Sequence, residues 1–460
     1  MNKTNCLPSR AAAALAVAVI FSSFAAGFST QGWPQWRGAN GAARAADFKV
    51  PKTWPKELTQ KWKVTVGEGV ATPALVGDRL YVFTRQDGGE VIRCLNASTG
   101  KELWLDKYDS LGATGPAQSF SGPRSSPAVA DGKVVTVGVR GMLSCLDAAT
   151  GRLLWRRDDF QAWPNFFVSS SPLILDGTVV AQLGGRENGA LVAYDLATGN
   201  EKWRWRSGNP SYASPAVATV DGVKLIVVQT EARLAAVNAA DGRVVWEGDR
   251  GTPPDSPGGR GGRGGGGRDY KATTPAADGP VVFITGRANK AIRFEKSAEG
   301  FKANQLWSNE EKASQFASPV VKEGTLFGLS AANELFALDA QNGNLLWSAG
   351  ITAASQLAVA PPESRGDGGP ARPEGPGGRG GAGGGRMGGG SGYGSVVDAG
   401  TVLLALTPSA ELVAFEPSRD AFKEVARLRV ANSPTHAYPV PAGNRIFVKD
   451  RDSVILWTVE

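Results

Sequence analysis

Residues 171–203 contain the pattern that decides the fold. Ser171-Pro172 opens it, Ala193-Tyr194-Asp195-Leu196-Ala197-Thr198-Gly199 follows, and Trp203 closes it. The same order runs from Ser126-Pro127 through Leu146-Asp147-Ala148-Ala149-Thr150-Gly151 to Trp155. Self-similarity at a spacing of roughly 40–50 residues is typical of a radial or linear array of small units. The sequence therefore says more about architecture than about activity.

Each unit opens with a small residue followed by a proline. Proline has no N–H group and cannot donate within a sheet, so this strand must lie at an edge. In a propeller blade the innermost strand has one edge toward the central channel, where small side chains fit because the blades converge. The openings are Thr72-Pro73, Ser126-Pro127, Ser171-Pro172, Ser214-Pro215, Thr274-Pro275, Ser318-Pro319 and Tyr438-Pro439, with Ser395-Val396 in unit seven, where the proline is lost.

The rest of each unit reads as three further strands. Asp-Gly pairs such as Asp131-Gly132 and Asp176-Gly177 suit the positive φ of a tight hairpin. The next strand, for example residues 134–137, is almost continuously apolar, as expected when stacked blades cover both of its faces. A Thr-Gly turn then reverses the chain, and the fourth strand ends at a tryptophan. No segment has a convincing amphipathic helical pattern, so the predicted fold class is all-β.

The tryptophans that end the units also indicate how the ring closes. Trp62 precedes the first proline unit, whereas the chain ends at residues 453–457, which match a third strand with no fourth after it. We expect Lys61–Val66 to pair with the strand around Val454–Leu456 and to remove the free edges. The prediction is an eight-bladed β-propeller of four-stranded antiparallel blades, closed by an N-terminal strand that completes the last blade. A seven-bladed ring is the alternative, if unit seven is too degenerate. The tryptophans are Trp62, Trp104, Trp155, Trp203, Trp246, Trp307 and Trp347, with a position near Leu428 in unit seven.

The N-terminus has the features of an export signal. Lys3 and Arg10 precede an apolar run, Ala11–Ala26, that ends in small residues. This run is short and alanine-rich for a membrane span, so a retained anchor is the less favoured alternative. We predict a signal peptide at 1–29, an extension at 30–54 and a propeller at 55–460. After cleavage we expect a monomer, periplasmic or secreted, without stable membrane insertion.

Two glycine-rich inserts, 251–269 and 361–394, interrupt the predicted propeller. They offer nothing apolar to bury, so we expect them to be disordered. The formal net charge is +7, and much of it lies in the leader and these inserts, which leaves no basic patch on the folded body. Their Arg-Gly-Gly tracts also lack the interleaved aromatic residues that stack on RNA bases. We therefore expect no nucleic-acid partner.

The cysteines do not indicate a disulfide framework. Cys94 and Cys145 hold the same position in successive units. Equivalent positions in neighbouring units lie farther apart than the limit of about 7 Å between Cα atoms for a disulfide. Both are expected to be small buried side chains. Cys6 lies before the apolar run, so it is not placed as a lipid-bearing cysteine.

The stretch Ala-x-Asp-x-x-Thr-Gly-x-x-x-Trp resembles the tryptophan-docking motif of the pyrroloquinoline-quinone (PQQ) repeat propellers. Residues 193–203 match this motif in full, and weaker copies extend the resemblance over essentially all of residues 55–460. Residues 33–38, Trp-Pro-Gln-Trp-Arg-Gly, also resemble the opening motif of many exported proteins of this group. The resemblance implies that each tryptophan stacks on a peptide plane of the neighbouring blade. These indoles are then structural, and their bulk suits the wide outer part of the wedge.

One branch of these propellers implies a cofactor. Quinoprotein dehydrogenases are implied to bind PQQ between a tryptophan and a disulfide of adjacent cysteines, with Ca²⁺ and a catalytic aspartate. This sequence has no adjacent cysteines and no Cys-x-x-Cys-His haem motif. We therefore expect no cofactor-binding, metal-binding or catalytic residues, with PQQ and calcium kept as the alternative.

Other catalytic arrangements have little support. The chain has a single histidine, His436, which argues against His-based metal sites and Ser-His-Asp triads. Acidic residues after two of the fourth strands raise the alternative of paired carboxylates for hydrolysis, but such acids are more typical of solvated loops. They are Asp106, Asp109, Asp158 and Asp159.

At one end of the channel, we expect aromatic and charged side chains that could bind a ligand. Residues three places before each proline, or before its substitute Val396, are expected to converge on the channel mouth. Aromatic rings and a cation there would suit a small ligand or peptide. The simpler interpretation is that they plug the pore, because a narrow channel must be filled. The candidates are Arg124, Tyr212, Phe316, Tyr393 and His436.

Two functional classes follow from these observations. The first is a non-enzymatic cell-envelope interaction scaffold or ligand-binding propeller, whose partner is an envelope protein or a small ligand at the mouth. Its architecture resembles that of the propeller lipoproteins of the outer-membrane β-barrel assembly machinery, but the missing lipid-anchor cysteine means that their role does not transfer. The second class is a PQQ-dependent, quinoprotein-like alcohol or sugar oxidoreductase.

Overall fold

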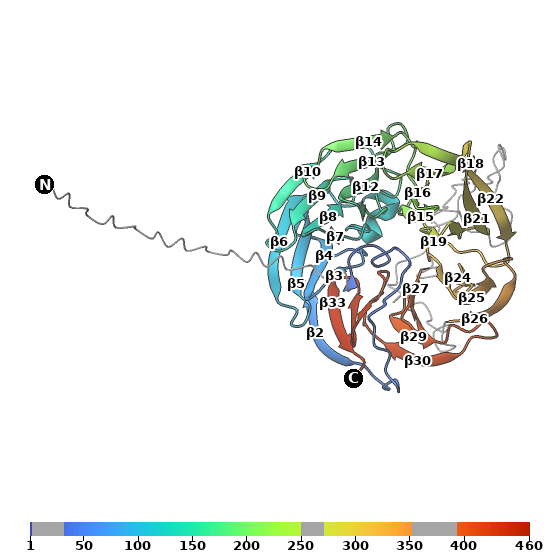
Figure 1. Cartoon of the computed structure of the whole chain (residues 1–460). Helices are drawn as coiled ribbons and strands as arrows, with labels where there is room; N and C mark the ends of the chain where they lie inside the picture. The colour runs from blue at the N-terminus through green and yellow to red at the C-terminus, as the bar shows by residue number, and fades with distance from the viewer. Residues whose placement is uncertain (2–31, 250–270, 352–392) are drawn as a thin grey trace, which may run out of the picture.

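The computed structural model describes Met1 and residues 32–249, 271–351 and 393–460. Antiparallel sheets stand side by side in a ring of eight blades around a central channel (Figure 1). Within the described ranges the only helical element is the short 3₁₀ helix η1 (Gly115–Phe120). The prediction of an all-β, eight-bladed propeller is confirmed. The predicted signal peptide and nearly all of both predicted inserts lie outside the described residues.

Seven blades are built from consecutive strands, numbered outward from the channel. Blade 1 contains β3 (Ala74–Val76), β4 (Arg79–Gln86), β5 (Gly89–Asn96) and β6 (Glu102–Asp109), and blade 2 contains β7 (Ala128–Ala130), β8 (Lys133–Val137), β9 (Leu143–Asp147) and β10 (Leu153–Arg157). Blade 3 contains β11 (Leu173–Leu175), β12 (Thr178–Leu183), β13 (Ala190–Asp195) and β14 (Glu201–Trp205). Blade 4 contains β15 (Ala216–Val220), β16 (Val223–Gln229), β17 (Arg233–Asn238) and β18 (Val244–Asp249). Blade 5 contains β19 (Ala276–Asp278), β20 (Val281–Ile284), β21 (Asn289–Ser297) and β22 (Gly300–Asn309). Blade 6 contains β23 (Val320–Lys322), β24 (Thr325–Leu329), β25 (Glu334–Asp339) and β26 (Leu345–Gly350). Blade 7 contains β27 (Ser395–Asp398), β28 (Leu403–Leu406), β29 (Glu411–Phe415) and β30 (Glu424–Arg429).

Blade 8 joins the two ends of the chain and closes the ring. It consists of β31 (Val440–Ala442), β32 (Arg445–Lys449), β33 (Ser453–Thr458) and β2 (Thr59–Thr65). β2 pairs antiparallel with β33, with Trp62 opposite Leu456, and Figure 1 shows blue β2 alongside red β33. The predicted closure by an N-terminal strand is confirmed. Unit seven forms a complete blade although its motif is eroded, so the seven-bladed alternative is wrong.

Tryptophans of the outer strands lock most blades to the next along the perimeter. The Trp155 indole N–H donates to the Leu196 carbonyl at 3.1 Å, and Gly199 lies under the same ring. A Cβ at Gly199 would come within 2.7 Å of the indole, and its φ of +72° also favours glycine. Trp62 docks in the same way on blade 1, through the Ala97 carbonyl at 3.1 Å, so the closing seam carries the same lock. The stacking implied by the repeat motif is confirmed.

The hydroxyl groups of the Ser/Thr-Pro openings link the blades around the channel. The Ser126 N–H donates to the Ser171 hydroxyl, and the Ser171 N–H donates to the Ser214 hydroxyl, both at 2.9 Å. Each hydroxyl thus satisfies a backbone donor of the preceding blade that has no strand partner on the channel side. We call this set the hydroxyl girdle. Its acceptors are Thr72, Ser126, Ser171, Ser214, Thr274 and Ser318.

The two cysteines of the repeats are buried and unpaired. Cys94 on β5 and Cys145 on β9 have no exposed surface and lie in different hydrophobic clusters. Burial raises the pKa of the Cys94 thiol to about 11 and that of the Cys145 thiol to about 12. Both behave as small core side chains, as predicted.

Residues 32–49, the N-terminal arm, run inside the ring. Within the arm, β1 (Gly32–Trp33) adds a fifth strand to blade 1 on the channel side of β3, with Trp33 opposite Leu75. Trp33 is fully buried. The Pro34 carbonyl accepts the Val129 N–H of blade 2 at 2.8 Å. No pattern in the sequence predicted that this segment fills the channel.

The arm also crosses the channel to the far blades. The Arg37 guanidinium is fully buried and donates to the Pro319 carbonyl of blade 6 at 2.5 Å and to the Tyr438 hydroxyl next to blade 8 at 3.3 Å. The Trp36 indole donates to the Thr274 hydroxyl next to blade 5 at 2.9 Å. These two side chains therefore fasten the arm at the level of the hydroxyl girdle.

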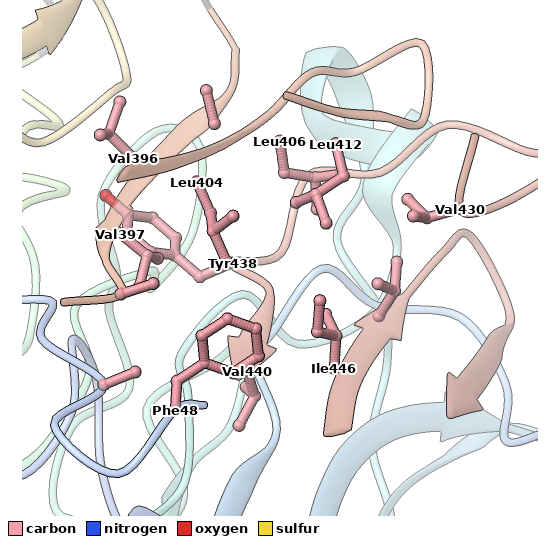
Figure 2. Close-up of a cluster of buried hydrophobic side chains, with 14 of the residues drawn as sticks. Phe48, Val396, Val397, Leu404, Leu406, Leu412, Val430, Tyr438, Val440 and Ile446 are labelled. Atoms are coloured by element: carbon pink, nitrogen blue, oxygen red, sulfur yellow. The ribbon is translucent and has the colours of Figure 1, made fainter. Parts of the chain in front are cut away.

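The arm leaves the channel through a charged and apolar anchor on blades 7 and 8. Arg44 forms an ion pair with Asp398 at 3.0 Å, and the buried Lys322 pairs with the same carboxylate at 3.0 Å. Phe48 then packs against β27 and β31, near Val397 and Val440 (Figure 2). The arm therefore contributes to the core of the ring instead of lying on its surface.

Candidate functional site at the channel mouth

Each predicted mouth residue lies just before the inner strand of its blade. Because strands alternate in direction, the loops into the first strands and the turns between second and third strands emerge on one face, the mouth face. The hairpin turns between first and second strands emerge on the opposite, hairpin face. The side chains of all the predicted mouth residues are partly exposed to solvent. These residues are Arg124, Tyr212, Phe316, Tyr393 and His436.

Three of the predicted residues form one aromatic cluster. The rings of Phe316 and Tyr393 stack in parallel, with centroids 4.0 Å apart and planes at 7°. His436 meets Tyr393 edge-on at 5.1 Å, and Phe120 at the end of η1 meets His436 at 5.0 Å and 90°. Offset and edge-on geometries are the arrangements that aromatic rings prefer. With Phe120, the cluster is thus a packed patch assembled from four separate inter-blade segments.

Tyr212 and Arg124 belong to the loops before blades 4 and 2. The Tyr212 hydroxyl accepts the Phe166 N–H at 3.2 Å, and the two rings lie 5.9 Å apart. Arg124 donates to the carbonyls of Phe166 at 3.0 Å, Ala117 at 3.2 Å and Phe120 at 2.9 Å. Burial lowers the pKa of this guanidinium. Arg124 therefore joins the loop that contains η1 to the loop before blade 3, and acts as a clamp between them.

His436 is an uncharged member of the mouth. Burial lowers the pKa of its imidazole to about 4, so the side chain is neutral at pH 7. Its Nδ1 atom is buried and has no hydrogen-bond partner among the described residues. The imidazole can therefore act through a hydrogen bond or a ring contact, not through charge.

The aromatic surface continues outward over blades 2 and 3. The Arg140 guanidinium lies 4.6 Å from the ring of Trp163, and Trp163 stacks on Phe167 at 5.8 Å and 14°. Arg140 also donates to the Leu111 carbonyl at 2.9 Å. Sequence reasoning missed this extension, together with Phe120 and Phe166. The available signal was that aromatic residues gather in the same inter-blade segments as the predicted candidates.

Two of the four acidic residues considered for hydrolysis form ion pairs. Asp106 pairs with Arg156 at 2.5 Å, and Asp159 pairs with Arg157 at 3.1 Å. Asp159 also accepts the Tyr194 hydroxyl at 3.0 Å. No group of three or more His, Cys, Asp or Glu side chains suited to a metal ion occurs among the described residues.

The known proteins that this chain resembles fall into two groups. The sequence model of the family described as outer membrane protein assembly factor BamB matches residues 87–349. The BamB of Xanthomonas campestris is 28% identical over 303 residues, which cover 55% of this chain and 70% of that protein. The quinohemoprotein alcohol dehydrogenase of Comamonas testosteroni is 31% identical over 165 residues, which cover 34% of this chain. The match spans only 23% of that dehydrogenase.

Solved structures from the same two groups share the fold. The BamB structure from Moraxella catarrhalis superimposes with a TM-score of 0.56 at 14% identity, over 87% of this chain and 99% of that one. The quinohemoprotein alcohol dehydrogenase structure from Comamonas testosteroni gives 0.58 at 14% identity, over 93% of this chain and 80% of that one. At this identity the likeness concerns the fold alone.

Proposed function

Because the chain belongs to the family described as outer membrane protein assembly factor BamB, we propose that it is a non-enzymatic interaction protein of the cell envelope. We propose that it binds an envelope protein or a small ligand at the channel mouth. The observation that carries this proposal is the partly buried aromatic cluster of Phe316, Tyr393 and His436, mounted on a rigid ring. Aromatic groups held on a fixed scaffold supply contact area at low entropic cost.

Two observations support an envelope location. The N-terminal residues 1–29 read as an export signal, and relatives over more than half of the chain are named as outer membrane assembly factors. Within the described part of the chain, no helix is long and apolar enough to cross a bilayer. We propose a periplasmic or secreted monomer, whose partner engages the mouth face.

We also propose that PQQ is not a resident cofactor. The residues that the resemblance implies for a PQQ site do not fit: Cys94 and Cys145 lie in separate blades and cannot form the vicinal disulfide. PQQ carries carboxylates that need cationic partners, but the Arg37 and Arg124 guanidinium groups already donate to protein oxygens. The second candidate function is that of an oxidoreductase, because part of the chain is similar to a quinohemoprotein alcohol dehydrogenase.

One experiment distinguishes the two candidates. Purified protein is mixed with PQQ and Ca²⁺, and its melting temperature and dye-linked oxidation of alcohols and sugars are measured. The interaction proposal predicts neither a saturable thermal shift nor turnover. Saturable binding accompanied by turnover would replace it with the oxidoreductase.

A second experiment tests the mouth directly. Tagged protein captures its partner from envelope extract, and the double variant Tyr212→Ala/Tyr393→Ala should lose that partner while its circular dichroism spectrum is unchanged. Phe301→Ala is the matched control, because Phe301 is a partly buried aromatic residue at the turn between β21 and β22 on the hairpin face. Equal capture by the folded double variant would refute the mouth as the binding site.

A further inference from the structure

The channel contains a cavity on the hairpin side of the girdle, at the end opposite the mouth. It has a volume of about 300 Å³ and lies between the N-terminal arm and the inner strands β11, β15 and β19. A volume of this order is at the lower end of the range for small-molecule sites. The arm packs closely against blades 1, 2 and 6 to 8, and the cavity lies between the arm and blades 3 to 5, where Gln35 and Trp36 form part of its wall.

Three girdle hydroxyls at the cavity wall have hydrogens to donate. Ser171 and Ser214 each accept a backbone N–H at 2.9 Å. Thr274 accepts two donors, the Ser214 N–H at 3.2 Å and the Trp36 indole at 2.9 Å. A hydroxyl oxygen has two acceptor positions and one hydrogen, so the Thr274 hydroxyl can only donate further. None of the three hydroxyl hydrogens has an acceptor among the described residues.

A positive charge without a carboxylate partner adjoins these donors. Arg37 belongs to the cavity wall, is fully buried, and forms no ion pair with any described acid. Its hydrogen bonds go to the carbonyls of Gly41 and Pro319 and to the Tyr438 hydroxyl, and none of these partners is a carboxylate. A buried charge that lacks an opposite charge is strongly unfavourable. Arg37 therefore stabilises a negative charge in the cavity. Because its side chain is fully buried, it does so by electrostatic attraction and not by direct contact with a ligand.

The rest of the wall combines apolar side chains with the polar Gln35, Asn40 and Thr219, and the volume of the cavity limits the ligand to a small one. Leu173, Pro215 and Val217 line the cavity together with the ring of Trp36. Exposed turn acids at the hairpin ends of the same blades, Asp221 among them, disfavour ligands with several negative charges.

From these donors, this charge and these walls, we infer that the channel cavity binds a small monocarboxylic acid. Its carboxylate accepts the hydroxyl hydrogens of Ser171, Ser214 and Thr274, and its short apolar body packs against Leu173 and Val217. A carboxylate has acceptor positions for all three donors. The site lies away from the mouth and does not depend on the function proposed for it.

The test uses sodium hexanoate as the probe and hexanamide as its uncharged counterpart, with binding measured by calorimetry and thermal shift on the full chain. We expect saturable binding of hexanoate and at least about tenfold weaker binding of hexanamide, since hydrogen bonds to a charged group are the stronger ones. Equal binding of the two probes, or no binding of hexanoate, would overturn the inference.

Two pairs of variants locate the site. Thr274→Val should weaken hexanoate binding by about tenfold, whereas Thr274→Ser, which keeps the hydroxyl, should stay close to the parent. Because Thr274→Val could also disturb the girdle, Val217→Phe serves as a second variant that fills the cavity and leaves every hydroxyl in place. Tyr212→Ala/Tyr393→Ala should leave hexanoate binding unchanged. Full binding by folded Val217→Phe, or loss of binding in the mouth variant, would place the ligand elsewhere and refute the cavity site.

Discussion

The perimeter and the channel of this propeller are stabilised in opposite ways. On the perimeter, the same tryptophan lock recurs from blade to blade, as at Trp104 and Trp155. In the channel, one arm makes unrepeated contacts with most of the ring, through Trp33, Trp36 and Arg37. A repeated lock can be degraded in one unit without loss of the fold, as in blade 7. The arm is present only once, and no second copy of its contacts exists in the described part of the chain. A substitution in the arm should therefore lower the free energy of unfolding more than the same substitution on the perimeter.

The largest difference is expected between two tryptophans. Trp33→Ala removes a fully buried indole from the arm and should lower the free energy of unfolding by about 4 kcal/mol. Trp104→Ala removes a partly buried indole from one perimeter lock and should cost about 2 kcal/mol. Urea denaturation of both variants measures the two values. A perimeter cost equal to or larger than the arm cost would contradict the comparison.

The next effect concerns the anchor of the arm. Asp398→Asn removes the carboxylate that pairs with Arg44 and with the buried Lys322. Lys322 then keeps only the longer contact of 3.8 Å to the exposed Glu323 carboxylate, and losing its buried partner should cost about 3 kcal/mol. The control is Asp176→Asn, whose carboxylate pairs with Lys224 on the exposed surface and should contribute at most about 1 kcal/mol. Denaturation at low and high salt checks the assignment, because salt should screen the exposed Lys224–Asp176 pair more strongly than the buried Lys322–Asp398 pair.

A smaller effect separates the perimeter lock from ordinary turn geometry. Gly199→Ala places a Cβ within 2.7 Å of the Trp155 ring at a φ of +72°, and should cost about 2 kcal/mol. Gly177→Ala has a similar φ of +67° but nothing within 4 Å of the added Cβ, and should cost about 1 kcal/mol. Thermal denaturation of the two variants gives the contribution of the indole. Equal melting temperatures would mean that the lock tolerates the methyl group.

The smallest predicted effect belongs to the mouth and depends on pH. Because burial holds the pKa of His436 near 4, against an ordinary value of 6.5, the unfolded chain takes up a proton in this range before the folded chain does. Stability should therefore fall by about 1 kcal/mol between pH 7 and pH 5.5, and fall further as the pH approaches 4. His436→Gln removes the only histidine and should flatten the profile in that interval. An unchanged slope in His436→Gln would contradict the buried, neutral imidazole.

The sequence predicted the features that recur. The Ser/Thr-Pro openings, the Asp-Gly hairpins and the closing tryptophans are local patterns, and eight copies made their meaning visible. The pairing of residues 61–66 with the strand around Val454 also followed, because a missing fourth strand leaves an edge that must be covered. The register of the repeats likewise brought Phe316, Tyr393 and His436 to one cluster.

The features that occur once could not be predicted from the sequence. The arm has no periodicity, and its place in the channel depends on contacts with Pro319 and Tyr438, far along the chain. For the girdle, the sequence predicted small residues where the blades converge, but not the hydrogen bonds between them. Those bonds join residues of different blades, which no local pattern relates. Arg124 was expected to face a ligand, but its donors reach loop carbonyls whose positions depend on the whole ring.

Native-state hydrogen exchange tests most directly whether the arm is an integral part of the ring. The amides of Ala43 and Ala45 in the arm, and that of Asp398, which donates to the Ala43 carbonyl at 2.8 Å, can be compared with amides of β6 and β10 on the perimeter. We predict that the arm amides exchange only through global unfolding, with protection equal to or greater than that of the outer strands. Exchange of the arm amides by local opening, while the outer strands stay protected, would show that the ring stands without the arm.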